Sequence, residues 1–158
     1  AYVERLPALL QGYYRAACIL STIYRGTPAA PGLVLGLDRG GACRGLAYAV
    51  AAESAGDVID YLYQREMITS VYRPRYVNVA LNDGRRVRAL TFITNREHVQ
   101  YAGRLSLEEA ACLVRQGHGR SGSSRDYLFS TVEHLKLLGI RDTRLHKLLA
   151  LVNRDQAF

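Results

Sequence analysis

The chain has 158 residues, of which 49% are hydrophobic and 22% charged, and its formal net charge is +7. This composition is typical of a globular chain of one domain's length and excludes a disordered tail. No apolar run approaches the roughly 20 residues that span a bilayer, and the first residues lack the order of a signal peptide. We therefore expect a cytoplasmic protein with no membrane partner, forming a single domain over residues 1–158.

The first part of the chain is predicted to be rich in strands. Strands are predicted where aromatic and β-branched residues cluster or where apolar and polar residues alternate. These segments are 12–22, 33–37, 43–50, 72–81 and 86–94. Prolines break a loop at 24–32, a turn is expected at 38–41, and a helix is expected at about 54–66. The last two strands are joined by Asn82-Asp83-Gly84, a hairpin signature.

The rest of the chain is predicted to be helical. N-caps are expected at Ser106, at Ser123 or Ser124, and at Asp142. Ser106 with Glu109 makes a capping box for a helix of about 106–116, and Gly139 ends the next helix. The last helix has an apolar stripe of Leu145, Leu148, Leu149 and Val152. Strands followed by helices indicate an α+β domain, with hairpins making most of the sheet.

Glu66 is the first candidate for chemistry. The predicted helix before it carries an apolar stripe of Val58, Ile59, Leu62 and Tyr63. At 100° per residue Glu66 falls near the centre of that stripe, where burial raises the pKa of a carboxylate and suits it to take and give protons. The alternative is that the helix ends earlier and Glu66 pairs with Arg73 or Arg75. The pattern alone favours neither reading.

A glycine-rich segment at 117–122 has the spacing G-x-G-x-x-G but follows a helix, so it is not a dinucleotide fingerprint. It is either a loop whose N–H groups hold a carboxylate at a helix N-terminus, or a plain helix–helix connection. Tyr127, in the first turn of the next helix, either points its hydroxyl into a cleft near this loop or lies at the edge of the core.

Metal and nucleic-acid chemistry have little support. Cys18, Cys43 and Cys112 are expected to be buried thiols, because no histidine lies at ligand spacing from them. We expect no metal and no cofactor. The arginines are dispersed, and Arg86 and Arg88 are predicted on the solvated face of a strand, so nucleic-acid binding is the less favoured alternative and no nucleic-acid partner is expected.

Several segments, in order along the chain, resemble those of one known family. They are Tyr24-Arg25-Gly26-Thr27-Pro28, Cys43-Arg44-Gly45-Leu46-Ala47-Tyr48, Tyr61-Leu62-Tyr63-Gln64-Arg65-Glu66-Met67, Gln100-Tyr101-Ala102-Gly103, and Gly119-Arg120-Ser121-Gly122-Ser123 through Tyr127-Leu128. The family is that of the ChaC-type γ-glutamylcyclotransferases, and the match covers nearly the whole chain. It implies an α+β fold with a mixed, partly closed β-sheet and surrounding helices.

The resemblance also implies an activity, the cleavage of glutathione to 5-oxoproline and Cys-Gly by attack of the substrate's α-amine on its own γ-carbonyl. Glu66 matches the catalytic acid/base glutamate, and Tyr127 and Ser123 fall at substrate-binding positions. No metal or nucleotide is implied. A non-catalytic binding or regulatory domain of the same fold is the alternative, and the oligomeric state stays open.

One family feature is missing from the sequence. The family has an N-terminal strand and a Tyr-Gly-Ser-Leu loop whose backbone holds the glutamyl end of the substrate, and no Tyr-Gly-Ser-Leu occurs in the 158 residues. We therefore expect the cleft beside Glu66 to be open on one side and bordered by strand edges that lack a partner.

Overall fold

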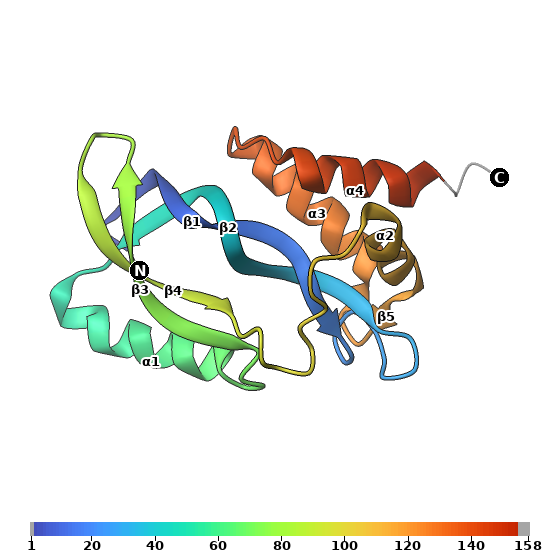
Figure 1. The fold of residues 1–158 in the computed structure, drawn as a ribbon. Helices are drawn as coiled ribbons and strands as arrows, with labels where there is room; N and C mark the ends of the chain where they lie inside the picture. Colours follow the sequence, from blue (N-terminus) through green and yellow to red (C-terminus); the bar gives the residue numbers. More distant parts are fainter. Residues whose placement is uncertain (1, 155–158) are drawn as a thin grey trace. The chain divides into compact units, whose positions relative to one another are not determined.

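The computed structural model describes residues 2–154, which form two compact units (Figure 1). The first unit contains residues 2–16 and 37–98, and the second contains 17–36 and 99–154. Each unit is described by itself below. The expected single domain over 1–158 therefore stays a prediction.

Four strands form the main sheet. They are β1 (Glu4–Ser21), β2 (Gly32–Ala49), β3 (Tyr72–Leu81) and β4 (Arg86–Thr94), in the order β2-β1-β3-β4. β3 is antiparallel to both β1 and β4, and the β3–β4 pairing runs from Tyr72 opposite Thr94 to Ala80 opposite Arg86. The predicted bounds of these last two strands are confirmed. The predicted α+β architecture is confirmed as well.

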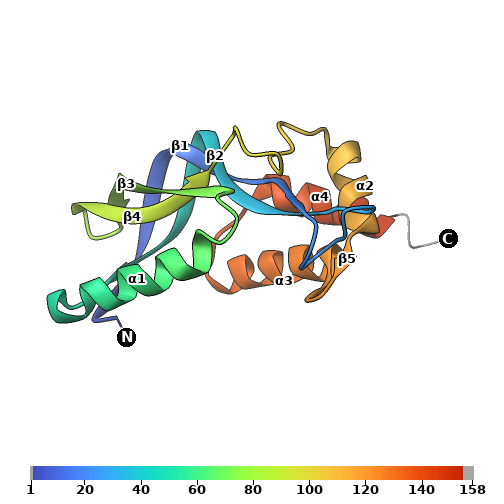
Figure 2. The same cartoon turned by 90° about the horizontal axis from the view of Figure 1, so that it is seen from below.

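The first unit also contains one helix, which lies beside the sheet (Figure 2). The helix is α1 (Ala55–Glu66), preceded by the short 3-10 turn η1 (Ala52–Ser54). β1 begins earlier than predicted, because Leu6, Ala8 and Leu10 reach an apolar cluster with Val79 and Leu81. α1 has no fully buried residue, so its apolar stripe is only half-covered.

The predicted turn at 38–41 is wrong, because β2 continues through it as one strand. Gly40 and Gly41 have φ values of 116° and 55°, so they bend the chain without ending the strand. Asp38 is 2% exposed, and its carboxylate accepts hydrogen bonds from the Arg39 N–H at 2.9 Å and from the Arg96 guanidinium at 2.7 Å. This ion pair fixes the bend to the residues that follow β4.

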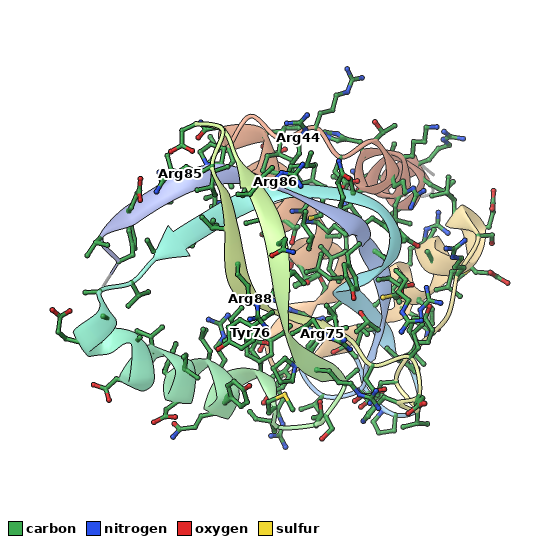
Figure 3. All side chains as sticks on the ribbon, turned by 60° about the vertical axis from the view of Figure 1, so that its left-hand side comes forward. Arg44, Arg75, Tyr76, Arg85, Arg86 and Arg88 are labelled. Carbon is green, nitrogen blue, oxygen red and sulfur yellow. The ribbon has the colours of Figure 1, made fainter. Side chains whose placement is uncertain are left out.

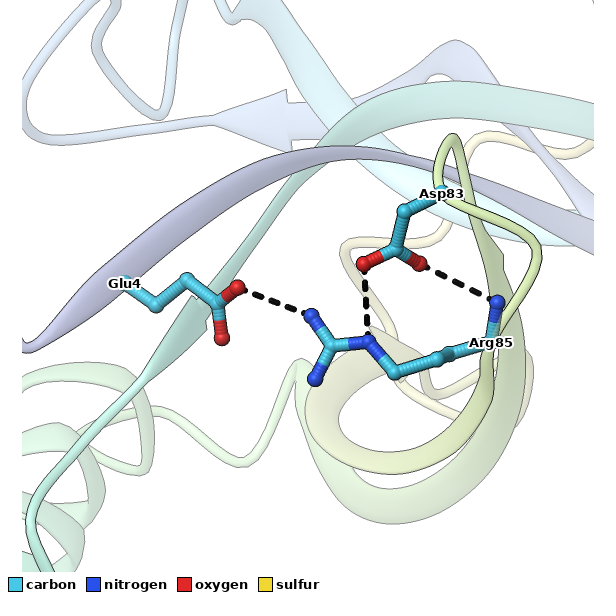
Figure 4. Close-up of polar contacts among 3 residues, drawn as sticks. All are labelled: Glu4, Asp83 and Arg85. Carbon is cyan, nitrogen blue, oxygen red and sulfur yellow. Dashed lines mark hydrogen bonds and ion pairs between the residues drawn. The ribbon is translucent and has the colours of Figure 1, made fainter.

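The β3–β4 turn is held by one arginine (Figure 4). Asp83 accepts from the Arg85 N–H at 3.1 Å and from Arg85 Nε at 2.8 Å, and Glu4 accepts from Arg85 Nη2 at 2.8 Å. The backbone and side-chain hydrogen bonds from Arg85 lower the pKa of Asp83 below its ordinary value, and those to Asp83 and Glu4 raise the pKa of Arg85. The charge of Arg85 is thus offset within the turn, and Gly84 closes it at φ +92°.

The second unit has a helical core. Its helices are α2 (Leu107–Gln116), α3 (Ser124–Leu137) and α4 (Thr143–Arg154). The capping box of Ser106 and Glu109 is confirmed, Ser123 caps α3, and Asp142 accepts from the Leu145 N–H at 3.1 Å. The predicted apolar stripe of α4 is buried, at Leu145, Leu148, Leu149 and Val152. It packs with α2, α3 and Leu33 of β2.

The cysteines differ from the prediction. Cys18 is buried, but Cys43 is half-buried. Cys112 is exposed on α2, between the buried residues Ala111 and Val114. In residues 2–154, no three His, Cys, Asp or Glu side chains gather as they would around a metal ion. Over the same residues, no helix is both long and apolar enough to cross a membrane.

Candidate functional site

Glu66 is the last residue of α1, so the alternative in which the helix ends before it is wrong. Its side chain is 27% exposed, and Oε1 lies 3.4 Å from Nε of Arg65. Arg73, one of the expected alternative partners, pairs with Glu97 at 3.0 Å instead. The carboxylate is therefore half-buried and held loosely by an exposed neighbour. Its role as acid/base stays a prediction.

An apolar cavity of about 770 Å³ lies between α1 and the sheet of the first unit. Val58, Ile59 and Leu62 line it from the helix, and Glu66 follows one turn beyond Leu62. β2 and β4 contribute consecutive residues, 46–49 and 87–91, and these strands are the two ends of the sheet order. β2 and β4 are thus the edge strands of the sheet, each paired with a strand on one side only, and both border the same apolar cavity. A sheet with such edges can accept a further strand.

In the second unit, the glycine-rich segment packs against the loop that follows β1. It forms a small hairpin of β5 (His118–Gly119) and β6 (Gly122–Ser123), which the sequence did not predict. A Cβ on Gly117 would collide with the backbone of Gly32 and Arg25, and one on Gly119 with the backbone of residues 23–26. Glycine is therefore needed here for close backbone contact.

The amides of this segment are already engaged. The Arg120 N–H donates to the Ile23 carbonyl at 2.9 Å, and the Ser121 N–H donates to the Tyr24 carbonyl at 2.8 Å. The Ser124 N–H, at the start of α3, donates to the Gly117 carbonyl at 2.9 Å. Because these three N–H groups already donate to backbone carbonyls, they favour the interpretation of the segment as a helix–helix connection over that of a loop that holds a carboxylate.

Ser123 and Tyr127 both have structural partners in this unit. The Ser123 side chain caps α3 by accepting from the Asp126 N–H at 3.0 Å. The Tyr127 hydroxyl accepts from the Leu35 N–H of β2 at 3.1 Å, so it is bonded to a strand. Glu66 belongs to the first unit and these two residues to the second. Their substrate-binding role, and a cleft shared with Glu66, stay predictions.

Arg25 is a candidate that the residue patterns did not single out. Its guanidinium donates to the Ser123 carbonyl at 3.2 Å, its Cζ lies 5.6 Å from the centroid of the Tyr127 ring, and its N–H donates to Ser21 Oγ at 3.0 Å. Within residues 2–154 it has no carboxylate partner. A half-buried cation held in place without a counter-ion is suited to bind an anion. The sequence signal was only its place in Tyr24-Arg25-Gly26-Thr27-Pro28.

Ser124 fastens the start of α3 to β2. Its side chain is fully buried, and Oγ accepts from the Leu33 N–H at 3.0 Å and donates to the Leu33 carbonyl at 2.7 Å. Ser124→Ala should lower the free energy of unfolding by about 1–3 kcal/mol, because two buried backbone groups lose their partner. Urea unfolding measures this. Ser130→Ala, at an exposed position of the same helix, is the control. If both variants lost the same small amount of unfolding free energy, the hydrogen bonds of Ser124 to Leu33 would not stabilise the fold.

Comparison with known proteins identifies relatives over nearly the whole chain. A family model described as ChaC-like protein matches residues 1–155. The glutathione-specific γ-glutamylcyclotransferase of Escherichia coli K12 is 35% identical over 153 residues, covering 97% of this chain and 66% of that protein. γ-Glutamylcyclotransferase 2-3 of Arabidopsis thaliana is 30% identical over 149 residues, covering 88% and 74%. The chain thus spans slightly less than two thirds of the E. coli protein's length.

The fold has solved counterparts. A crystal structure of the glutathione-specific γ-glutamylcyclotransferase from yeast superposes with a TM-score of 0.85 at 24% identity, covering 97% of this chain and 89% of that one. A second crystal structure of the yeast protein gives 0.82 at 25% identity, covering 97% and 91%. The sheet and helices described above are therefore those of the yeast fold.

Proposed function

Because the chain belongs to the ChaC-like protein family, we propose that it is a γ-glutamylcyclotransferase that cleaves glutathione into 5-oxoproline and Cys-Gly in the cytoplasm. The observation that carries the proposal is the family match over residues 1–155, together with relatives whose names specify this activity. Release of 5-oxoproline from glutathione tests it. A folded chain that carries the missing loop but releases none would favour a non-catalytic binding domain instead.

One carboxylate is sufficient for the reaction. Glu66 takes a proton from the substrate's α-ammonium, and the freed amine attacks the γ-carbonyl of the same glutamyl group. The new C–N bond closes the five-membered ring, and the bond to the cysteine nitrogen breaks as Glu66 returns its proton to that leaving amine. The ring nitrogen releases its second proton in becoming the lactam N–H, and the leaving amine takes up one further proton in becoming an ammonium. Protons and electrons balance without an oxidant or reductant. The half-buried position of Glu66 at the end of α1 supports this role.

Arg25 is proposed to bind one of the two carboxylates of glutathione. An arginine binds a carboxylate with two parallel hydrogen bonds when its guanidinium is free to do so. The Tyr127 ring and the Ser123 carbonyl restrict this guanidinium to one orientation. Tyr127 and Ser123 are therefore proposed to act on the substrate through Arg25, as positioning residues, and their hydrogen bonds to Leu35 and Asp126 hold them in turn.

Arg25→Gln should raise KM for glutathione by about 10- to 100-fold with a smaller effect on kcat, because a charge-assisted hydrogen bond to the substrate is lost. Initial rates of 5-oxoproline release at varied glutathione concentration measure the two constants. Arg120→Gln, which removes an exposed arginine from the neighbouring segment, should leave both constants near wild type. An unchanged KM in Arg25→Gln, in a protein of normal thermal stability, would remove Arg25 from the substrate site.

The missing loop is also part of the proposal. Intramolecular attack requires the glutamyl chain to be held folded, and a single acid/base residue does not supply that. We propose that a strand followed by Tyr-Gly-Ser-Leu provides the grip, and that this strand enters the apolar cavity bordered by β2 and β4. The two strand edges at that cavity support the proposal because each has backbone groups to pair.

A further inference from the structure

One side of the β3–β4 hairpin carries exposed polar side chains together with the half-buried Ala80 and Leu90. Asn78 lies opposite Arg88, Tyr76 opposite Leu90, and Ala80 opposite Arg86. Residues directly opposite in an antiparallel pair, and those two apart on one strand, point to the same side. Tyr76, Asn78, Arg86 and Arg88 therefore share one side, which we call the hairpin face. Figure 3 labels Tyr76, Arg86 and Arg88 on the hairpin. All four are exposed.

The positive charge of the hairpin face is not offset. In the described part of the chain, neither Arg86 nor Arg88 has a carboxylate partner. Three nearby arginines are paired: Arg73 with Glu97, Arg85 with Asp83 and Glu4, and Arg96 with Asp38. On the hairpin face, Arg86 and Arg88 therefore present two guanidinium groups, two residues apart on one strand, that can contact an anion.

The hairpin face also carries a stacking surface. Cζ of Arg88 lies 5.0 Å from the centroid of the Tyr76 ring, and Tyr76 remains 52% exposed. Aromatic rings and arginine planes are the groups on which proteins stack unpaired bases, usually on an exposed sheet. Asn78, opposite Arg88, adds an amide that can both donate to and accept from a base edge. The amide favours a nucleic acid over an anionic membrane surface, because it can form hydrogen bonds with a base edge.

We propose that the hairpin face binds single-stranded nucleic acid, with Arg86 and Arg88 on phosphates and bases stacked beside Tyr76. The proposal does not rest on the cyclotransferase activity. Arg88 is one of the residues 87–91 that line the cavity beside α1, so a further strand in that cavity and a nucleic acid on Arg88 would compete. The sequence led us to expect no nucleic-acid partner because its arginines are dispersed along the chain. The fold adds what the sequence pattern lacked. Tyr76 and Asn78 come from the opposite strand, and within residues 2–154 neither arginine forms an ion pair.

Binding of a labelled oligouridylate of about 12 nucleotides, followed by fluorescence anisotropy at several salt concentrations, tests the proposal. The wild-type chain should bind more weakly as salt rises. Arg86→Gln/Arg88→Gln should weaken binding by about 10-fold or more at low salt and reduce the slope of log K against log salt by about 1.4, or roughly 0.7 per arginine. The control is Arg73→Gln/Arg75→Gln, which removes the same charge from the other side of the hairpin.

Tyr76→Leu separates base stacking from charge. It should weaken oligouridylate binding by about 5- to 100-fold and leave heparin binding unchanged. The proposal is overturned by any of four results: no salt-dependent binding by the wild-type chain, an equal loss in the control variant, oligouridylate binding that is insensitive to Tyr76→Leu, or preferential binding to anionic phosphatidylserine vesicles. Circular dichroism of each variant confirms that the exposed substitutions leave the fold intact.

Discussion

Replacing Glu66 by glutamine should lower kcat for 5-oxoproline release by about 1000-fold or more while glutathione binding stays measurable. The amide keeps the shape of the side chain at the end of α1 but cannot take a proton from the α-ammonium or return one to the leaving amine. Turnover is measured by chromatographic detection of 5-oxoproline, and binding by calorimetry with the same protein. The chain used must carry the Tyr-Gly-Ser-Leu segment, because the proposed activity requires it.

Asp60→Asn is the matched control for this variant. Asp60 is an exposed carboxylate on the same helix, so the substitution makes the same chemical change away from the proposed site. It should leave kcat and KM near their wild-type values. Near-normal turnover by Glu66→Gln would refute the acid/base role, and an equal loss in both variants would mean that the helix rather than the carboxylate is responsible.

Gly117→Ala should destabilise the second unit by about 3 kcal/mol or more, lowering Tm by roughly 6–12 °C. A Cβ at this position would occupy the space of the Gly32 backbone and of the Arg25 carbonyl oxygen, and neither can move as a flexible side chain would. The same contact sets the path of the loop that carries Arg25. The variant should therefore lose substrate affinity together with stability. Differential scanning calorimetry measures the loss of stability.

Gly56→Ala tests whether the effect comes from lost space rather than from glycine as such. Gly56 lies in α1, and a Cβ there would meet no atom within 4 Å. Alanine is also a better helix former, so this variant should be more stable than wild type by about 0.5–1 kcal/mol. If Gly117→Ala were as stable as Gly56→Ala, the close backbone packing between the two loops would not exist in solution.

Local sequence signals were sufficient where a few neighbouring residues determine the structure. The β3–β4 hairpin follows from alternation on both sides of Asn82-Asp83-Gly84, and its bounds are those predicted. The capping box of Ser106 and Glu109 likewise sets the start of α2. In each case the partners lie within a few residues of one another, so the sequence contains the whole interaction.

Other features depend on contacts that sequence patterns do not reveal. Gly40 and Gly41 are compatible with either a turn or a bent strand, and the ion pair of Asp38 with Arg96, 58 residues away, accompanies the bent strand. The β5–β6 hairpin exists because its amides bond to the loop at 23–24. A turn prediction uses only neighbouring residues, so it does not take account of these distant partners.

The residues of the candidate site also differ in how far local sequence patterns point to them. Glu66 was singled out because a carboxylate on an apolar stripe is unusual within one helix, and the family resemblance implied its acid/base role, which stays a prediction. Arg25 was not singled out, because its significance lies in having no carboxylate nearby and in contacting Ser123 and Tyr127, about 100 residues later in the chain. The bond from Leu35 to the Tyr127 hydroxyl spans 92 residues and was equally inaccessible to pattern analysis.

The most direct test of the proposed activity is the amount of 5-oxoproline released from glutathione by a chain extended at its N-terminus with a strand and a Tyr-Gly-Ser-Leu loop. We expect this chain to release 5-oxoproline and Cys-Gly in equal amounts, and the 158-residue chain to release negligible amounts because nothing grips the glutamyl end. A folded, extended chain that binds glutathione but releases no 5-oxoproline would contradict the cyclotransferase assignment.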